Sequence, residues 1–83
     1  MSKPKRQFKP THYLDTTSII SLEIEVAIEN GQSFVYAAFY DGLSRSYDKV
    51  TKSTVRTNSY GHTYFVKGHQ RYYLADFMSK SLF

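Results

Sequence analysis

Ile20-Ser-Leu-Glu-Ile-Glu-Val-Ala-Ile-Glu29, followed at once by Asn30-Gly31, is the stretch of sequence that decides the fold. Large aliphatic residues alternate with polar or small ones throughout it. This period of two is typical of a strand with one buried face, because successive side chains of a strand point to opposite sides. Asn and Gly both tolerate the positive φ angles of a two-residue hairpin loop. The stretch therefore predicts a long strand that turns back on itself.

The length of this loop also predicts how the two strands pair. The second strand is expected over Ser33–Tyr40. On the core face, the predicted pairs are Val26 with Val35, Ile24 with Ala37, and Leu22 with Phe39. On the reverse face, they are Ala27 with Phe34, Glu25 with Tyr36, and Ser21 with Tyr40. The second strand is apolar on both faces, so we expect another segment of the chain, or a partner, to cover its reverse face.

A second hairpin is expected near the C-terminus. Its strands are Thr63–Lys67 and Gln70–Leu74, and Gly68-His69 suits a type II′ turn. The predicted pairs are Phe65 with Tyr72, Thr63 with Leu74, Tyr64 with Tyr73, and Val66 with Arg71. Residues 43–57 fit no single period and predict one or two short edge strands or an irregular β-arm. Leu74, Phe77, Met78 and Leu82 have the spacing of one face of a short helix.

The N-terminal residues 1–12 differ from the rest in composition. They contain both prolines of the chain and four basic residues, which predicts a flexible basic arm. Residues 13–83 are then expected to form one domain. The predicted fold class is mainly β, or α+β: a small antiparallel sheet of about four to five strands built from hairpins, with a short C-terminal helix and a disordered basic N-terminal arm.

Composition excludes several classes of protein. The chain has 83 residues, which fits one small domain with a thin core. It has no cysteine, so neither disulfides nor a thiolate metal site can stabilise it, and it suits a reducing compartment. No apolar run approaches the length of a membrane span, and no signal-peptide core follows the basic N-terminus. We therefore expect a cytoplasmic protein that does not bind membranes.

The motifs of common catalytic sites do not occur in the sequence. His12, His62 and His69 are far apart and lack neighbouring ligands with the spacing of a metal site, so we interpret them as surface or turn residues. Phosphate-binding loops, nucleophile elbows and zinc-protease motifs do not occur either. We predict a protein that is not an enzyme, with no cofactor, no metal and no small-molecule substrate.

Charge is distributed unevenly along the chain. Residues 1–14 carry four basic side chains and no acidic one, whereas residues 15–41 carry five acidic side chains and no basic one. Residues 42–83 carry seven basic side chains and two acidic ones. Such segregation favours a polyanionic or otherwise charged partner, or two parts of one domain that attract each other.

Basic residues alternate with aromatic residues in the second half of the chain, which favours binding of single-stranded DNA or RNA. Cations follow the phosphates, and each base that stacks on an aromatic ring contributes about 1–3 kcal/mol. Tyr64 and Tyr73, side by side with Arg71 next to them, would form a stacking platform. The predicted nucleic-acid-binding residues are Lys5, Arg6, Lys9, Arg45, Lys49, Lys52, Arg56, Tyr64, Lys67, Arg71 and Tyr73.

The alternative hypothesis is a protein-binding accessory or inhibitor module. Tyr, Phe and Arg dominate protein interfaces, and a free edge strand can extend a partner's sheet or close a homodimer. A small, self-contained protein of this kind is typical of a phage or plasmid factor that docks on a larger host protein. The predicted interface residues are Glu23, Glu25, Phe34, Tyr36 and Tyr40.

Overall fold

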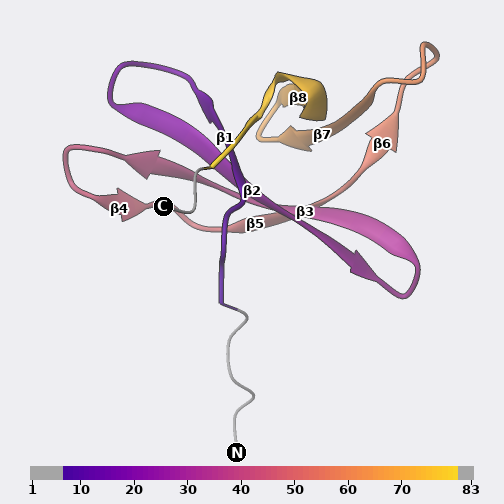
Figure 1. The fold of residues 1–83 in the computed structure, drawn as a ribbon, viewed down its shortest axis with the longest axis horizontal. Helices are drawn as coiled ribbons and strands as arrows, with labels where there is room; N and C mark the ends of the chain where they lie inside the picture. Colours follow the sequence, from indigo (N-terminus) through magenta and orange to yellow (C-terminus); the bar gives the residue numbers. More distant parts are fainter. Residues whose placement is uncertain (1–6, 81–83) are drawn as a thin grey trace, which may run out of the picture.

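The computed structural model describes residues 7–80, which form two antiparallel sheets stacked as two layers (Figure 1). The large sheet contains β1 (His12–Asp15), β2 (Ile20–Glu29), β3 (Gln32–Asp41), β4 (Ser46–Tyr47), β5 (Thr51–Thr54) and β9 (Met78–Ser79). The small sheet contains β6 (Arg56–Thr57), β7 (Thr63–Lys67) and β8 (Gln70–Tyr73). A single 3₁₀ turn, η1 (Leu74–Asp76), follows β8. The mainly β, antiparallel class predicted from the sequence is confirmed.

The β2–β3 hairpin forms with the predicted register. Val26 pairs with Val35, Ile24 with Ala37 and Leu22 with Phe39, and the three predicted pairs of the reverse face also form. Asn30 and Gly31 have φ angles of 53° and 78°, the positive values that a two-residue loop of this twist requires. The local sequence therefore suffices to set the register of the longest hairpin.

Two short strands continue the sheet along the far side of β3. β4 pairs with the end of β3, at Tyr40 and Asp41, and β5 pairs with its first half, from Phe34 to Ala37. Only Val55 separates β5 from β6, so the chain bends here from the large sheet into the small one. The two layers are thus joined at this corner by continuous backbone.

The β7–β8 hairpin covers the large sheet. Three of its four predicted pairs form, and Gly68 has the positive φ of 67° that the turn needs. The predicted pair of Thr63 with Leu74 does not form, because β8 ends at Tyr73 and Leu74 begins η1.

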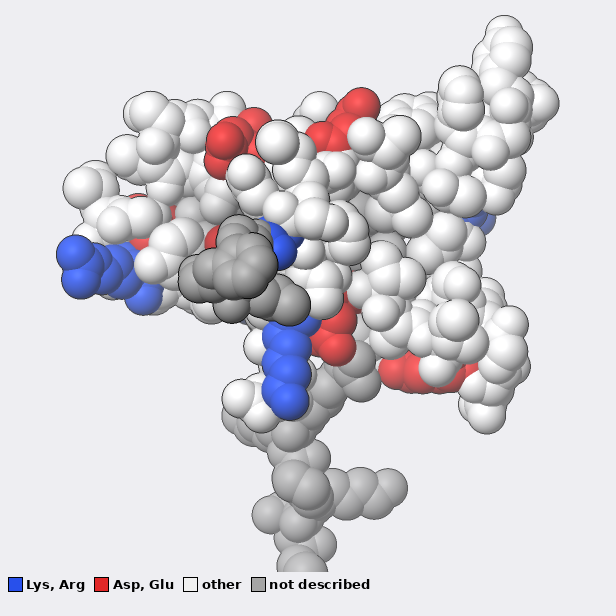
Figure 2. Space-filling model, in the orientation of Figure 1, with Lys and Arg blue, Asp and Glu red and all other residues white. Residues whose placement is uncertain are grey.

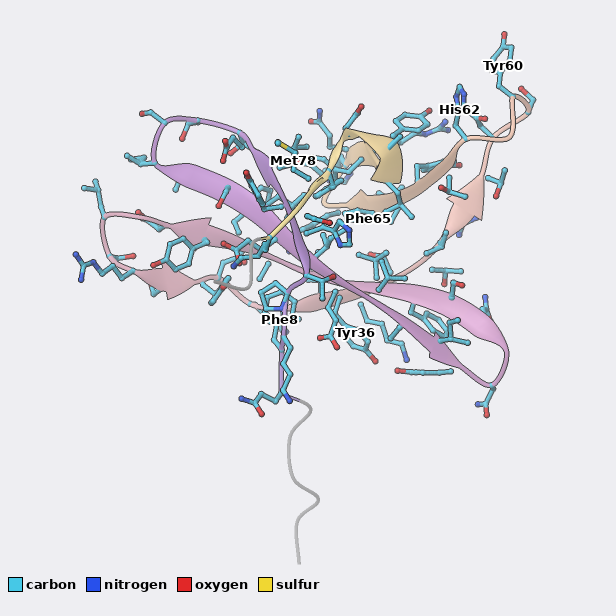
Figure 3. The ribbon with its side chains drawn as sticks, viewed as in Figure 1. Phe8, Tyr36, Tyr60, His62, Phe65 and Met78 are labelled. Carbon is cyan, nitrogen blue, oxygen red and sulfur yellow. The ribbon has the colours of Figure 1, made fainter. Side chains whose placement is uncertain are left out.

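The hydrophobic core lies between the two layers. The large sheet contributes Leu22, Ile24, Val35 and Ala37, and Phe65 and Phe77 pack against them. Figure 3 shows Phe65 between the two layers. Val26 and Ile28 belong to the same face of β2 but are 44% and 74% exposed. The small sheet therefore covers only the half of the β2–β3 hairpin that lies away from its loop.

The predicted C-terminal helix is wrong. The described part of this segment forms one 3₁₀ turn and then the short strand β9, which pairs with Tyr13 and His12 of β1. Phe77 is buried in the core, whereas Met78, expected on the same apolar face, is 61% exposed and points away from the layers in Figure 3. A helix of eight or nine residues is marginal on its own, and strand pairing at the sheet edge replaces it here.

The predicted count of about four to five strands in one sheet is also wrong, because the large sheet has six strands and the small sheet three. β1 accounts for part of the difference: it lacks an alternating pattern and is held by pairing with β2 on one side and β9 on the other. Within residues 7–80, no helix has the length and apolar character needed to cross a membrane.

Candidate nucleic-acid interface

The outward face of the small sheet brings together four of the predicted nucleic-acid-binding residues. Arg56 pairs with Tyr64, Tyr64 pairs with Tyr73, and residues directly opposite each other in a sheet share a face. The ring centroids of Tyr64 and Tyr73 are 5.4 Å apart, and the Arg71 guanidinium lies 4.8 Å from the centroid of Tyr64. Arg71 and Arg56 are both exposed.

Tyr64 itself is not open to a ligand. Its residue is 9% exposed, and Arg71 lies over its ring. This contact is a cation–π interaction, which stabilises the face and holds the guanidinium at the surface. The part of the predicted platform that Tyr64 would supply is therefore already occupied by the protein's own arginine.

Further aromatic rings continue this face into the loop between β6 and β7. The centroid of the His62 ring lies 6.4 Å from that of Tyr73 on one side and 6.4 Å from that of Tyr60 on the other. Tyr60 is 84% exposed and extends from the tip of the loop, away from both layers (Figure 3). We refer to Tyr60, His62, Tyr73 and Tyr64 as the aromatic row. Its exposed end is the loop end, not the centre of the sheet.

Asn58 holds this loop in shape. Its side-chain oxygen accepts hydrogen bonds from the backbone N–H groups of Tyr60 (2.9 Å) and His62 (3.0 Å), and its own backbone N–H donates to the His62 carbonyl (3.0 Å). Gly61 completes the turn with a φ of 84°. An Asn side chain that replaces backbone partners in this way stabilises a turn. Tyr60 is thus displayed by an ordered turn.

A groove runs between this loop and η1, where Ala75 and Asp76 line it. It has a volume of about 640 Å³, and Tyr60, His62, Tyr73, Asn58 and Asp76 are among the residues that line it. This volume is within the range of about 300–1,000 Å³ of small-ligand sites. Among the described residues that line the groove, two of the three rings belong to the loop, and the only charged side chain is that of Asp76.

Most other predicted basic residues lie elsewhere. Lys67 points into the molecule: its side chain is 7% exposed, and its ammonium donates to Thr51 Oγ1 (3.0 Å) and the Ala37 carbonyl (3.4 Å). Arg45 and Lys49 are exposed around β4, on the large sheet. Lys5 and Arg6 lie outside the described residues. On the face drawn in Figure 2, the blue side chains are separated from one another, with acidic side chains between them.

The predicted protein interface lies on the reverse face of the large sheet, where internal contacts occupy it. Glu23 is buried, and its Oε1 accepts hydrogen bonds from the Tyr47 hydroxyl (2.6 Å) and the Lys80 ammonium (2.7 Å). Glu29 accepts from the Tyr36 hydroxyl (2.6 Å) and from Lys52 (2.7 Å). The two ammonium groups neutralise the carboxylates, and the two hydroxyls donate a hydrogen bond to each of them.

The residues before β1 and two ring contacts complete this face. Phe8 packs edge-on against Tyr47 at 5.4 Å, and Lys9 donates its backbone N–H to Glu25 (3.0 Å). The described part of the predicted arm therefore contacts the sheet. Tyr40 packs on Tyr47 at 5.0 Å, and the Lys52 ammonium lies 4.2 Å from the Phe34 ring centroid. Much of the reverse face of β3, the second strand of the hairpin, is therefore covered by other parts of the protein.

Two side chains of the reverse face have shifted protonation equilibria. Burial raises the pKa of the Tyr47 phenol well above its ordinary value, and the hydrogen bond to Glu23 acts in the same direction. The hydrogen bond to Glu29 raises the pKa of Lys52. Both shifts favour the protonated side chains that donate these hydrogen bonds, so they stabilise the contacts of the reverse face.

The nucleic-acid-binding residues predicted from the sequence do not include Asn58, Tyr60, His62 and Asp76, although Tyr60 and His62 belong to the stretch in which basic and aromatic residues alternate. A Tyr within Asn58-Ser59-Tyr60-Gly61, a turn of otherwise small and polar residues, was the available signal, because a large ring at a turn tip has no core to enter. No local signal in the sequence places Asp76 at the groove, because its position depends on where η1 packs.

Among residues 7–80, no group of three or more His, Cys, Asp or Glu side chains could hold a metal ion. His12 lies between Thr11 and Ser79, with its ring nitrogens 2.9 Å and 3.4 Å from their hydroxyls. In comparisons with known proteins, the chain matches no protein-family model, no curated protein and no solved structure.

Proposed function

We propose that this protein binds single-stranded nucleic acid, DNA or RNA, through the exposed end of the aromatic row and the arginines beside it. The observation that carries the proposal is Tyr60. It is 84% exposed at the tip of an ordered turn, in a row with His62 and Tyr73. A large ring in this position contributes little to the core, whereas a base can stack on it.

The energetics of stacking fit this arrangement. Base–aromatic stacking contributes about 1–3 kcal/mol per base and tolerates any sequence. Arg71 and Arg56 lie on the same face as the row and remain exposed, so they are available to phosphate oxygens. Two phosphate contacts on a single strand predict a slope of log affinity against log salt of roughly −1.4, a shallow dependence in which stacking dominates.

The test is fluorescence anisotropy of labelled 12-nucleotide DNA and RNA single strands, and of duplex DNA, over a salt series. We expect single strands to bind better than the duplex, since duplex bases cannot stack on protein rings. Tyr60→Ala should weaken single-strand binding about 5- to 150-fold, the equivalent of one lost stacking contact. Arg71→Gln should weaken binding of all sequences alike and make the salt slope shallower by about 0.7, the share of one phosphate contact.

Leu43→Ala is the matched control, because Leu43 is 76% exposed and lies in the turn after β3, outside the small sheet. Its affinity should equal that of the wild type. Equal affinities for Tyr60→Ala and Leu43→Ala would refute the aromatic row as the site. Binding to heparin and nucleic acid alike that disappears at moderate salt would refute the function itself.

A second candidate function, binding of an extended protein strand, has support from one edge of β2. β1 pairs with β2 only as far as Ile24, and in residues 7–80 no strand pairs with this edge beyond it. Val26 and Ile28 lie there with exposed side chains. An open edge flanked by apolar side chains can accept another strand. Hydrogen exchange tests it: a partner strand should protect the Val26 and Ile28 amides, and Ile28→Lys should abolish that protection.

A further inference from the structure

Among residues 7–80, Asp76 is the one charged residue that lines the groove beside the aromatic row. η1 places it there directly after β8, together with Tyr73, and the residue is exposed. In the part of the chain that the structure describes, its carboxylate makes no hydrogen bond or ion pair. An ionised carboxylate is an acceptor only. The groove thus contains an acceptor with open capacity next to aromatic rings.

Asn58, one of the other polar side chains that line the groove, is already committed. The Asn58 side-chain oxygen accepts from two backbone N–H groups of the loop, and its amide nitrogen lies 3.5 Å from the Tyr73 hydroxyl. Asn58 therefore holds the loop and has little capacity left for a ligand. A ligand in the groove would meet ring surfaces, the polar atoms of His62 and Thr63, and one carboxylate that only accepts, so it should be flat and present hydrogen-bond donors.

We infer that this groove selects guanine among the bases of a single strand, an inference that rests on the proposed function. Guanine presents two adjacent donors on its pairing edge, the N1–H and the N2 amino group. These match the two oxygens of a carboxylate in the parallel arrangement that also makes arginine–carboxylate pairs strong. Single-stranded bases are read on this edge while they stack on aromatic rings.

The other bases lack this match to Asp76. Adenine and cytosine each place an acceptor nitrogen beside their amino group, so a carboxylate there would face a lone pair. Thymine and uracil have one N–H between two carbonyl oxygens, with the same consequence. Because Asp76 only accepts, each of these bases offers it at most one hydrogen bond and adds an electrostatic repulsion.

A carboxylate among aromatic rings is also suited to an organic cation, such as a guanidinium or quaternary ammonium group. Two observations favour a base. Tyr60, 84% exposed, extends outward and does not close over the groove as the wall of a cation cage would. In addition, Arg71 already lies on the same row, over Tyr64, where it repels a second cation and attracts a phosphate.

The experiment measures the affinity of the whole protein for labelled dT₁₂ strands that carry one central guanine, inosine, adenine or cytosine. Inosine keeps the N1–H of guanine and lacks the N2 amino group. The wild type should prefer guanine over adenine and cytosine by about 5- to 150-fold, the discrimination of a good bidentate contact. Inosine should rank between them.

Asp76→Asn should remove this preference while it keeps the binding of plain dT₁₂, because an amide offers one acceptor and one donor to an edge with two donors. Asp15→Asn is the control: Asp15 is exposed in β1, outside the lining of the groove, and the substitution changes net charge by the same amount. It should keep the guanine preference. Circular dichroism and the thermal midpoint confirm that each variant is folded.

The outcomes separate the inference from the proposed function. Tight binding of all four strands with equal affinity would overturn guanine selection and leave single-strand binding in place. A guanine preference that survives in Asp76→Asn would overturn the role of Asp76. Absence of binding to every strand would overturn the proposed function. A titration with GMP and with tetramethylammonium, followed at the backbone amides of residues 58–63, tests the other occupant: shifts with the cation alone would overturn the assignment to a base.

Discussion

The reverse face of the large sheet and the aromatic row of the small sheet use the same residue types for different purposes. On the reverse face, the hydroxyls of Tyr36 and Tyr47 each donate to a carboxylate at 2.6 Å. On the aromatic row, rings contact rings, and within the described residues the Tyr60 ring has no partner beyond the His62 ring. On the reverse face, tyrosine hydroxyls and carboxylates bind each other and close the surface. Within the described residues, no carboxylate bonds to the aromatic row, and its end at Tyr60 stays exposed.

Loss of the packing that both faces share should have the largest effect. Phe65 is fully buried between the layers; its ring stacks on Tyr72 with the centroids 5.6 Å apart and meets Phe77 in a tilted contact at 5.8 Å. Phe65→Ala should lower the free energy of unfolding by about 3–5 kcal/mol, through lost burial and the cavity it leaves. Urea denaturation followed by circular dichroism measures this loss. An effect below about 1 kcal/mol would show that the small sheet does not depend on this contact.

Removal of the charge on Glu23 should break the closed face alone. Glu23 is buried and bonded to Tyr47 and Lys80, so Glu23→Gln removes the ion pair and weakens both hydrogen bonds. We expect a loss of roughly 1.5–3 kcal/mol in the free energy of unfolding, the range for hydrogen bonds to charged groups. Single-strand binding of the folded variant should be unchanged. A variant as stable as wild type would show that this contact only offsets its own desolvation.

The raised pKa of Tyr47 makes the closed face sensitive to alkali. An unfolded tyrosine ionises near pH 10, whereas the folded phenol, held by burial and by Glu23, stays protonated above that pH. The folded state then retains a proton that the unfolded state loses, so the stabilisation present below about pH 10 is lost as pH rises. The difference in unfolding free energy between wild type and Tyr47→Phe should shrink from about pH 10 upward. Urea titrations from pH 8 to 11 measure it, and a constant difference would contradict the shift.

The smallest effect on stability is expected at the open face. Tyr60 is 84% exposed, so Tyr60→Ala should change the free energy of unfolding by less than about 0.5 kcal/mol. The same variant should show the large loss of single-strand affinity described above. This combination sharpens the contrast with Glu23→Gln, which should lose stability and keep binding. A thermal midpoint well below that of wild type would mean that Tyr60 contributes to the fold after all.

The two hairpins show how far local sequence predicts this structure. The register of β2 and β3 followed from alternation and from the Asn30-Gly31 loop, and most of the β7–β8 register followed from Gly68. In each case the information lies within a few residues of the turn. β1 and β9 have no such local signal, because each strand is stabilised by pairing with a segment far away in the sequence.

The candidate site was predictable only in part. The sequence placed Tyr64, Arg71 and Tyr73 on one face, and the structure does the same. The exposure of each ring depended on distant contacts: Arg71 covers Tyr64, while Tyr60 has no segment above it. Lys67 has the same sequence character as the exposed cations, yet it turns inward to Thr51, because its strand packs over β5.

By itself, the sequence determined the strands of the two main hairpins, their turns and most of their pairing, because alternation and glycine-containing turns act over a few residues. Only the tertiary structure decided which half of the β2–β3 hairpin is covered, which acidic residues are neutralised, and that Asp76 meets the aromatic row at one groove. Burial is a property of what packs against a residue, and here the packing segments come from distant parts of the chain.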